Sequence, residues 1–444
     1  MNALLLSAVL GVIMMFSGIV LKQKSAVRNI AIGGMSLLLL SNLLEMKGKL
    51  FFAIHAEGMM HFDRFSLLFT SIIFAATLIY LVLSARDMEK VGSYYAEYFA
   101  LIFFILCGVV LASSFKSLLI LFLGIEIISI PLYILTGSDK KNLKSNEASL
   151  KYFLLGAFST GLMLMGIALI YGSTGTFSTW KMNIGDKAGV LMIAGMILLL
   201  FSMAFKVSAA PFHFWTPDVY DGAPTVFTSF MATIVKAAVF IAFIRLFDEA
   251  FGALKPQWQL WIALITAATL FIGNITAVFQ QSVKRMLAYS SISQAGFMLL
   301  SLYAMNAMAK EGLLLYSAAY SLATIGIFAV LIKMSDYTFD GFNGLAKKEP
   351  LLAATTAIFL LSLAGIPLTA GFMAKFYLLN AAIATGKNLW LVIFAVLMAA
   401  VSVYYYFRVI QAMYFKEGQP KPISVSPVFK WTLVLLAGLI IILG

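Results

Sequence analysis

The stretch that decides the fold is residues 189–215, which read GVLMIAGMILLLFSMAFKVSAAPFHFW. It begins with an apolar run that is nearly long enough by itself to cross a bilayer, since a spanning helix needs roughly 20 mostly apolar residues. Lys206 stands near the end of this run, and Pro211 follows five residues later. A proline in a spanning helix frees backbone polar groups, which are tolerated only where protein or a water-filled cavity satisfies them. The stretch therefore predicts a broken membrane helix beside a polar interior.

The rest of the chain has the same apolar character. Hydrophobic residues make up 62% of the 444 positions and charged residues only 11%, whereas soluble domains carry about 25% charged residues. The longest weakly apolar stretches, Glu45–Arg64 and Asp336–Pro350, are the size of loops. The sequence thus predicts an all-α, polytopic membrane protein that forms a single membrane domain over residues 1–444, with no appended soluble module.

Charged and Gly/Pro/Asn-rich interruptions divide the chain into about fourteen predicted spans. The first, Ala3–Leu21, lacks the basic start and cleavage pattern of a secretory signal, so we interpret it as a retained span. The predicted spans are Ala3–Leu21, Asn29–Leu44, Phe65–Ser84, Tyr98–Ser114, Leu118–Thr136, Ala148–Tyr171, Gly189–Phe212, Val226–Phe247, Trp258–Gln280, Met286–Ala304, Gly312–Met334, Leu351–Ile383, Leu389–Tyr414 and Phe429–Leu443.

The loops between these spans carry Lys and Arg unequally. The side that holds the termini has 10 of them and the opposite side has 17. Because the side richer in Lys and Arg faces the cytoplasm, we expect both termini on the non-cytoplasmic side. The formal net charge of +12 is thereby explained by topology, and a nucleic-acid partner is not expected.

A second break resembles the first. Gly365-Ile366-Pro367 interrupts the twelfth span, and Pro367 lies 156 residues after Pro211. Tyr152 and Tyr316, at matching places in the sixth and eleventh spans, are 164 residues apart. These offsets favour an internal duplication of about five helices, over residues 98–247 and 258–414, as in transporters built from repeats around discontinuous helices.

Four charged residues lie deep in the predicted spans: Glu126, Lys206, Lys236 and Lys375. A charge at mid-bilayer costs at least about 2.5 kcal/mol on insertion scales, so such residues usually face a polar cavity or a partner. A helix-packing ion pair is the alternative for each, and Lys206, nearer a helix end, could also extend to the interface.

Three further features carry weaker signals. His213 follows the first break, where a proton-relay role and a structural role are both reasonable. Lys151 begins the sixth span, where a working role and a purely topogenic charge are equally reasonable. Residues 288–297 (AYSSISQAGF) crowd hydroxyl and amide groups into one helix, which fits either small-residue packing or a hydrated path.

The titration of such groups favours proton transport. Burial disfavours the charged forms of Lys and Glu, and a mutual ion pair favours them, so separating a pair can release or capture a proton. The chain has no glycine-rich phosphate loop and no nucleophilic triad. Its single cysteine, Cys107, also excludes an intrachain disulfide or a cysteine-held redox cofactor.

At four motifs the sequence closely resembles the antiporter-like membrane subunits of respiratory complex I, and most of all their subunit N branch. The resemblance covers essentially the whole chain, and the second and fourth motifs are the most specific. The motifs are Asn146–Phe153 (NEASLKYF), Ala209–Tyr220 (AAPFHFWTPDVY), Gly222–Ala238 (GAPTVFTSFMATIVKAA) and Ala364–Tyr377 (AGIPLTAGFMAKFY).

The resemblance implies fourteen helices with two inverted five-helix repeats, each containing one broken helix. It also implies that Glu126 and Lys206 form a switchable ion pair, that Lys236 is the central lysine and that Lys375 leads outward. His213 matches the histidine that links the half-channels in this family.

The function implied is proton translocation by a membrane subunit of a NADH:quinone oxidoreductase, a translocase whose redox chemistry occurs elsewhere. NADH, FMN, iron–sulfur clusters and quinone are then expected in other subunits, with neighbouring membrane subunits and lipids as partners. A bacterial cytoplasmic membrane is the expected location. The alternatives are a subunit of a multisubunit cation/proton antiporter, which uses similar Glu/Lys machinery, and a structural membrane subunit.

Overall fold

The computed structural model describes residues 1–51, 58–182, 189–418, 420–421 and 423–444. In these residues the chain is almost entirely helical, and β-structure is limited to three isolated bridges. The α-helices are α1 (Asn2–Val20), α2 (Lys24–Met46), α3 (Arg64–Met88), α4 (Tyr95–Ser114), α5 (Leu118–Thr136), α6 (Leu143–Thr174), α7 (Val190–Lys206), α8 (Trp215–Gly222), α9 (Thr225–Phe230), α10 (Lys236–Glu249), α11 (Lys255–Val278), α12 (Val283–Ala304), α13 (Ala307–Lys333), α14 (Leu345–Lys348), α15 (Pro350–Ala364), α16 (Ala370–Ile383), α17 (Leu389–Phe415) and α18 (Pro427–Ile442).

The predicted all-α membrane fold is confirmed. Within the described residues, ten helices are long and apolar enough to cross a membrane by length and composition. The other predicted spans correspond to the more polar α12, to the shorter α7 and α18, and to the pair α15 and α16. Two predicted spans were drawn too short, because α2 covers 23 residues and α6 covers 32.

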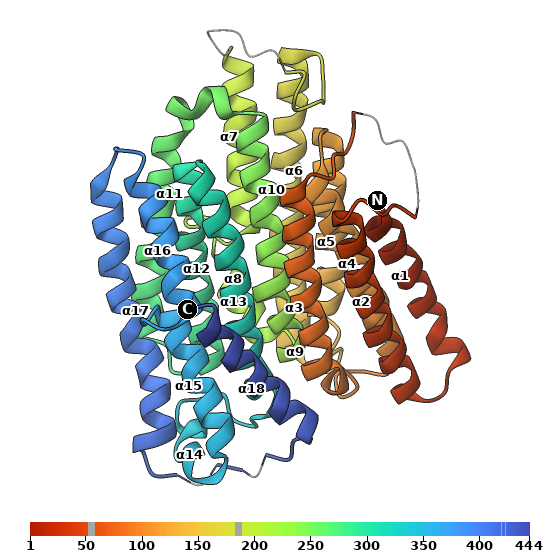
Figure 1. Cartoon of the computed structure of the whole chain (residues 1–444), viewed down its shortest axis with the longest axis vertical. Coiled ribbons are helices and arrows are strands. Elements are labelled where there is room, and N and C mark those ends of the chain that lie inside the picture. The colour runs from red at the N-terminus through yellow and green to blue at the C-terminus, as the bar shows by residue number, and fades with distance from the viewer. Residues whose placement is uncertain (52–57, 183–188, 419, 422) are drawn as a thin grey trace.

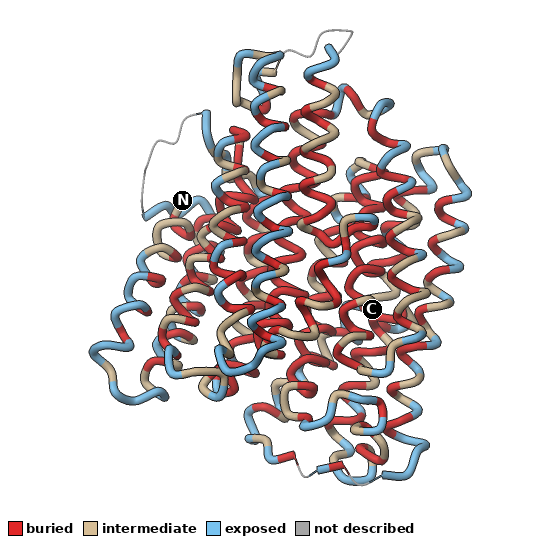
Figure 2. Tube along the Cα trace, turned by 180° about the vertical axis from the view of Figure 1, so that it is seen from behind, coloured by how far each residue is buried: buried red, intermediate tan, exposed pale blue. Residues whose placement is uncertain are grey.

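The helices stand side by side in one elongated bundle, with α1 and α2 at one edge and α17 at the other (Figure 1). Buried residues concentrate on the helices in the middle of the bundle (Figure 2). The most hydrophobic window of Thr225–Glu249 is 100% buried inside the protein, whereas that of α1 is 33% buried. Lys236 therefore lies on a helix that other helices surround.

Both predicted breaks are present. α7 ends at Lys206, six residues before the predicted end at Phe212, and turns lead to α8. In the twelfth span, α15 ends at Ala364 and α16 begins at Ala370. Each break contains a non-glycine residue with left-handed backbone, Ser208 at φ 65° and Leu368 at φ 70°. Such conformations persist only where the surrounding structure holds them, and they cluster at functional sites.

A third irregularity gave no signal in the sequence. Met231–Val235 form a π-helical turn between α9 and α10, and Lys236 follows it directly. Single π-turns inside α-helices are rare and frequently occur at functional sites, because the wider turn alters the direction of nearby side chains. The turn therefore marks the position of Lys236 independently of its charge.

Candidate functional site

Glu126 and Lys206 form the first buried ion pair. Lys206 Nζ lies 3.6 Å from Glu126 Oε1 and donates to Ser129 Oγ at 2.9 Å. Thr160 Oγ1 on α6 donates to the same carboxylate oxygen at 2.7 Å. Lys206 is the last residue of α7, where the helix dipole favours a cation. The expected contact between the two side chains is present, and three helices supply its atoms.

Aromatic rings lie next to this pair. Tyr133, two turns after Glu126 on α5, packs edge-on against Tyr152, with ring centroids 4.8 Å apart. Tyr152 stacks on Trp215 at 4.6 Å, and Trp215 donates to the carbonyl of Phe205 at 3.1 Å. The Tyr133 hydroxyl is buried and has no hydrogen-bond partner among the described residues. These rings hold α5, α6, α7 and α8 together around the break.

Lys236 is 3% exposed and points towards α12. Its amine donates to the Ser291 carbonyl at 2.7 Å and to Ser291 Oγ at 2.8 Å. In the described part of the chain it forms no ion pair. Thr233 Oγ1, in the π-turn, is bonded to the Ser229 carbonyl at 2.6 Å, so it does not contact the amine. The polar partners of Lys236 thus come from the serine-rich helix.

A second polar network begins at the adjacent residue of α12 and reaches α17. The neighbouring Ser290 shares a 2.5 Å hydrogen bond with the hydroxyl of Tyr406. Gln294 Nε2 donates to the same hydroxyl at 3.0 Å, and Gln294 Oε1 accepts from Tyr316 on α13. The hydroxyls and the amide in residues 288–297 therefore meet one another and their neighbours, which small-residue packing alone does not require.

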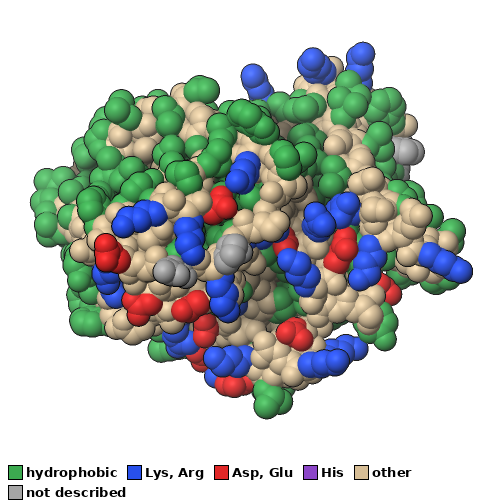
Figure 3. All heavy atoms as spheres, turned by 90° about the horizontal axis from the view of Figure 1, so that it is seen from below, with side chains coloured by type: hydrophobic (Ala, Val, Ile, Leu, Met, Phe, Trp, Pro, Cys, Tyr) green, Lys and Arg blue, Asp and Glu red, His purple; other side chains and the backbone are tan. Residues whose placement is uncertain are grey.

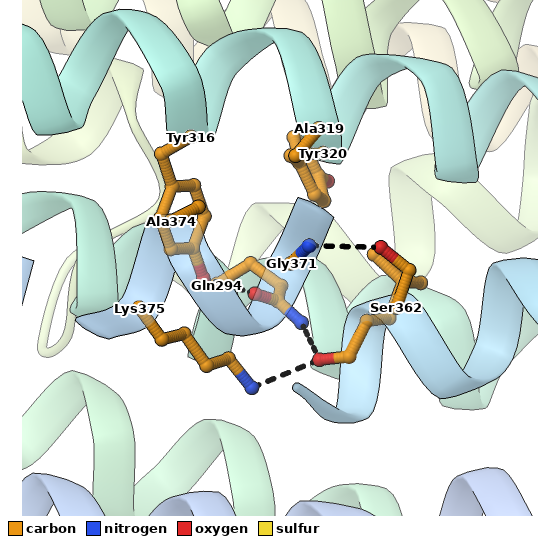
Figure 4. Close-up of a pocket in the computed structure, with 9 residues that line it drawn as sticks. Gln294, Tyr316, Ala319, Tyr320, Ser362, Gly371, Ala374 and Lys375 are labelled. Carbon is orange, nitrogen blue, oxygen red and sulfur yellow. Dashed lines mark hydrogen bonds between the residues drawn. The ribbon is translucent and has the colours of Figure 1, made fainter. Parts of the chain in front are cut away.

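Lys375 lies at the end of this network, at the second helix break (Figure 4). Its amine donates to the carbonyls of Leu363 at 2.9 Å and Ala364 at 3.0 Å, which are the last residues of α15. Helix ends leave such carbonyls without an intrahelical donor. Gln294 Nε2 donates to the same Leu363 carbonyl at 3.0 Å. One backbone oxygen therefore joins Lys375 to the network that begins at Ser290, the residue next to the Ser291 partner of Lys236.

A small cavity lies beside this junction, lined by Lys375, Gln294, Tyr316 and Tyr320 together with residues of α15 and α16. Its volume of about 10 Å³ is close to the minimum for one water molecule, about 10–15 Å³. The hydroxyls of Tyr320, Ser317, Ser321 and Thr324 on α13 are buried without a partner among the described residues. Polar groups of this kind are usually satisfied by buried water.

Two glycines make the junction possible. Gly365 has φ +82°, and an added Cβ would lie 2.9 Å from Cδ of Lys375. Gly371 begins α16 so close to α15 that an added Cβ would overlap the Ser362 carbonyl, at 1.8 Å. The N–H of Gly371 instead donates to Ser362 Oγ at 3.1 Å. Gly365, which the sequence marks as part of the break, and Gly371, which it does not, are therefore both required for close approach.

His213 and Lys151 stand apart from these contacts. His213 is 6% exposed, and its Nδ1 has no hydrogen-bond partner among the described residues. Lys151 is 42% exposed on its side chain and pairs with Asp218 Oδ2 at 3.0 Å and Glu147 Oε1 at 2.7 Å. Lys151 is therefore not buried like the other three lysines, and its contacts hold α6 against α8.

Two further buried cations, Lys284 and Arg245, were not singled out from the sequence, because both stand close to the end of a predicted span, where basic residues are common. Lys284 is 3% exposed and donates to the carbonyls of Asp221 and Ala223 at 2.8 and 2.7 Å. Arg245, also 4% exposed, binds Asp63 and Glu249 at 3.3 and 3.1 Å. Burial alone would raise the pKa of Asp63, but the Arg245 charge and the Ser66 N–H hold that pKa below its usual range.

A resident metal has little support. In the parts of the chain that the structure describes, no group of three or more His, Cys, Asp or Glu side chains could hold a metal ion. The site consists of amines, one carboxylate, hydroxyls and backbone carbonyls.

Comparison with known proteins decides the family. Residues 115–402 match the family model described as NADH:quinone oxidoreductase/Mrp antiporter, TM. The chain belongs to this family. Among curated members, it is 41% identical to NADH-quinone oxidoreductase subunit N of Cytophaga hutchinsonii, over 100% of this chain and 97% of that protein. It is 37% identical to the protein of the same name from Flavobacterium psychrophilum, over 100% and 98% of the two chains.

Solved structures of family members have the same fold. A chain of respiratory complex I from Thermus thermophilus is 34% identical, with a TM-score of 0.85 over 100% of this chain and 96% of that chain. A chain of the Mrp complex from Dietzia sp. is 19% identical, with a TM-score of 0.87 over 100% and 94%, which shows the fold alone. The predicted family and its subunit N branch are thus confirmed.

Proposed function

We propose that this chain is the proton-translocating, antiporter-like subunit N of a NADH:quinone oxidoreductase, and that Glu126, Lys206, Lys236 and Lys375 move the proton. The observation that carries the proposal is that two hydrogen-bonded groups meet at adjacent residues of α12. Lys236 donates to Ser291, and the neighbouring Ser290 shares a bond with Tyr406, whose network reaches the carbonyl to which Lys375 donates. Packing lysines would need only local partners, whereas a conduction path needs titratable groups joined by exchangeable hydrogen bonds.

In this proposal Glu126 and Lys206 act as the switch. An ion pair taken out of water is stabilised by its own attraction, and removal of one partner leaves an uncompensated buried charge. A displacement of α5 against α7 would therefore change which protonation state is favoured at Lys206. The described residues contain no direct hydrogen bond from this pair to Lys236, so we assign the transfer between them to water, with His213 at the break as its intermediate.

Lys236 and Lys375 form the second stage. Their amines donate to hydroxyl and carbonyl oxygens, which can accept from a neutral amine as well as, more strongly, from a charged one. A proton can therefore leave either amine without breaking its hydrogen bonds. Tyr406 and Gln294, together with water in the adjoining cavity, would carry the proton between the two lysines. Lys151 is assigned a supporting role at the Asp218 surface.

The partners, cofactors and location of the complex are part of the same proposal. NADH, FMN, iron–sulfur clusters and quinone are assigned to other subunits, and neighbouring membrane subunits and lipids are assigned as partners. We place the complex in a bacterial cytoplasmic membrane, with both termini on the non-cytoplasmic side because of the unequal loop charges. We also propose that residues 98–247 and 258–414 are two inverted repeats, on the strength of one broken helix in each.

Purification of the chain from its native membrane tests this proposal. Mass spectrometry of the intact complex should identify the other NADH-quinone oxidoreductase subunits, and vesicles that contain the complex should acidify when NADH and quinone are supplied. Co-purification with cation/proton antiporter subunits, without NADH-dependent proton movement, would reject it. Labelling of single cysteines in the Lys140–Lys144 loop from outside intact cells would separately reject the orientation.

A further inference from the structure

A pocket of about 720 Å³ lies far from the proton path, between the start of α2, the end of α3, the end of α13 and the start of α18. This size falls within the range of small-molecule sites, about 300–1,000 Å³. The pocket is lined by Arg28, Asn29, Ile32, Val82, Leu83, Arg86, Asp87, Lys90, Lys333, Ser424, Val425, Ser426, Val428 and Phe429.

The mouth of the pocket carries excess positive charge. Its lining contains four basic side chains and a single carboxylate, Asp87. Asp87 is 3% exposed and is shared by two of the amines, Lys333 and Lys90. Arg28 is partly neutralised by Glu89 at 3.1 Å, and Arg86 is exposed and forms no ion pair among the described residues. An anion would therefore find unmatched donors here.

A helix N-terminus adds to this charge. α18 has 16 residues and begins at Pro427, and the Ser426 side chain accepts from the Phe429 N–H at 3.3 Å. Pro427 has no N–H, and Ser426 accepts from the N–H groups of Phe429 and Lys430, so the start of α18 contributes mainly the positive end of its helix dipole, which favours phosphate. Lys333 stands over the Phe429 ring at 5.1 Å, so the amine and the helix start lie on the same side of the pocket.

The walls below the mouth are apolar. Ile32, Val82, Val425 and Val428 contribute aliphatic surface, and Val428 is 63% exposed. Basic groups gather with fewer acidic ones on the face of the molecule that these helix ends share (Figure 3). A free inorganic anion would leave the aliphatic walls uncovered, whereas a phospholipid would cover them with an acyl chain while its phosphate meets the basic mouth.

We propose that this pocket binds an anionic phospholipid, with its phosphate at Arg86, Arg28 and the start of α18 and its acyl chains along Ile32, Val82 and Val428. The pocket lies at the end of the bundle that carries more Lys and Arg, where anionic lipids attract basic groups. The lipid would link the first three helices to α18, which contact one another little elsewhere. Proton movement is not required for this binding.

The test uses the intact membrane complex in phosphatidylcholine vesicles that contain a photoactivatable phosphatidylglycerol. After illumination, mass spectrometry should find the label on the end of α3 and the start of α18. Arg86→Gln should reduce this labelling about fivefold, the loss expected for one basic residue near an anionic surface. Lys141→Gln removes an exposed charge from a loop outside the pocket and should leave the labelling unchanged.

Three results would overturn the proposal. A photoactivatable phosphatidylcholine that labels these segments equally would show that anionic charge is not recognised. Competition by inorganic phosphate would show a site for a soluble anion. Labelling of the isolated chain but not of the complex would show that a neighbouring protein covers the pocket. Equal thermal unfolding of the Arg86→Gln and unsubstituted complexes separates lost binding from lost folding.

Discussion

In the first half of the chain a carboxylate holds the buried Lys206 amine, whereas in the second half neutral oxygens hold the amines of Lys236 and Lys375. The carboxylate of Glu126 favours a charged amine. Hydroxyl and carbonyl oxygens accept from an amine in either protonation state. Under the proposed function, the first region would switch when its two helices move, and the second would conduct without moving.

The two regions also differ in their connections. The atoms around Lys206 come from α5, α6 and α7, and aromatic rings enclose them. The network around Lys375 extends over α12, α13, α15 and α17 and borders a cavity. An ion pair enclosed by aromatic rings is suited to controlling proton release, and an extended network near buried water is suited to proton transfer. Substitutions in each region can test this proposed difference in function.

The largest effect is expected for Lys236→Met, which removes the amine and keeps most of the side-chain length. Loss of a proton-transferring group typically costs at least about 100-fold in rate, so NADH-driven acidification of vesicles should nearly disappear. Lys236→Arg should fail as well, because a guanidinium does not release its proton in a protein. Assembly should be normal on native gels. Undiminished pumping by either variant would place the path elsewhere.

Glu126→Gln should have the next largest effect, because it leaves Lys206 as an unpaired buried charge. We expect a loss of roughly 3 kcal/mol in the free energy of unfolding, at the low end for buried pairs since Glu126 is 18% exposed. Combining it with Lys206→Met should restore much of this stability but not proton translocation. Thermal unfolding and vesicle acidification, measured as a double-mutant cycle, separate the two effects. If the double variant pumped normally, the pair would be structural.

Tyr406→Phe tests the proposed conducting region by removing a single hydroxyl. The change removes the atom shared by Ser290 and Gln294, and we expect proton translocation to fall by about tenfold, less than for loss of Lys236 itself. Tyr303→Phe is the matched control, because its side chain is equally buried but its hydroxyl donates to the Lys387 carbonyl at 2.9 Å, outside the network. Equal rates in the two variants would remove Tyr406 from the path.

The smallest effect is expected at the surface pair of Lys151. Burial raises the pKa of Asp218, but hydrogen bonds from Lys151 and Arg285 hold it below its usual value. Because the pKa is depressed in the folded state, its stabilisation is present above about pH 4 and is lost as the pH falls further. Asp218→Asn should lower the free energy of unfolding by about 1 kcal/mol or less at pH 7, since the pairs are exposed. The difference should vanish in acid, and proton translocation should change little.

The sequence predicted much of the site because charged residues within apolar runs and helix-breaking residues can be recognised without a structure. Glu126, Lys236 and Lys375 stand in apolar runs where no loop could accommodate them, and proline or glycine marks both breaks. The serine-rich residues 288–297 were recognised as polar, but their partners Tyr406 and Leu363 lie far away in sequence. Tyr406 could have been noticed only as one of several tyrosines on a predicted span.

Composition and hydropathy by themselves determined that this chain spans a membrane, since lipid requires every backbone polar group to be satisfied within helices. They also determined which charges are costly enough to need partners. The partners themselves, such as the Leu363 carbonyl for Lys375 and Ser291 for Lys236, were decided only by tertiary structure. The physical reason is that hydrogen bonds act over about 3 Å, and only the packing of distant helices brings these atoms within that distance.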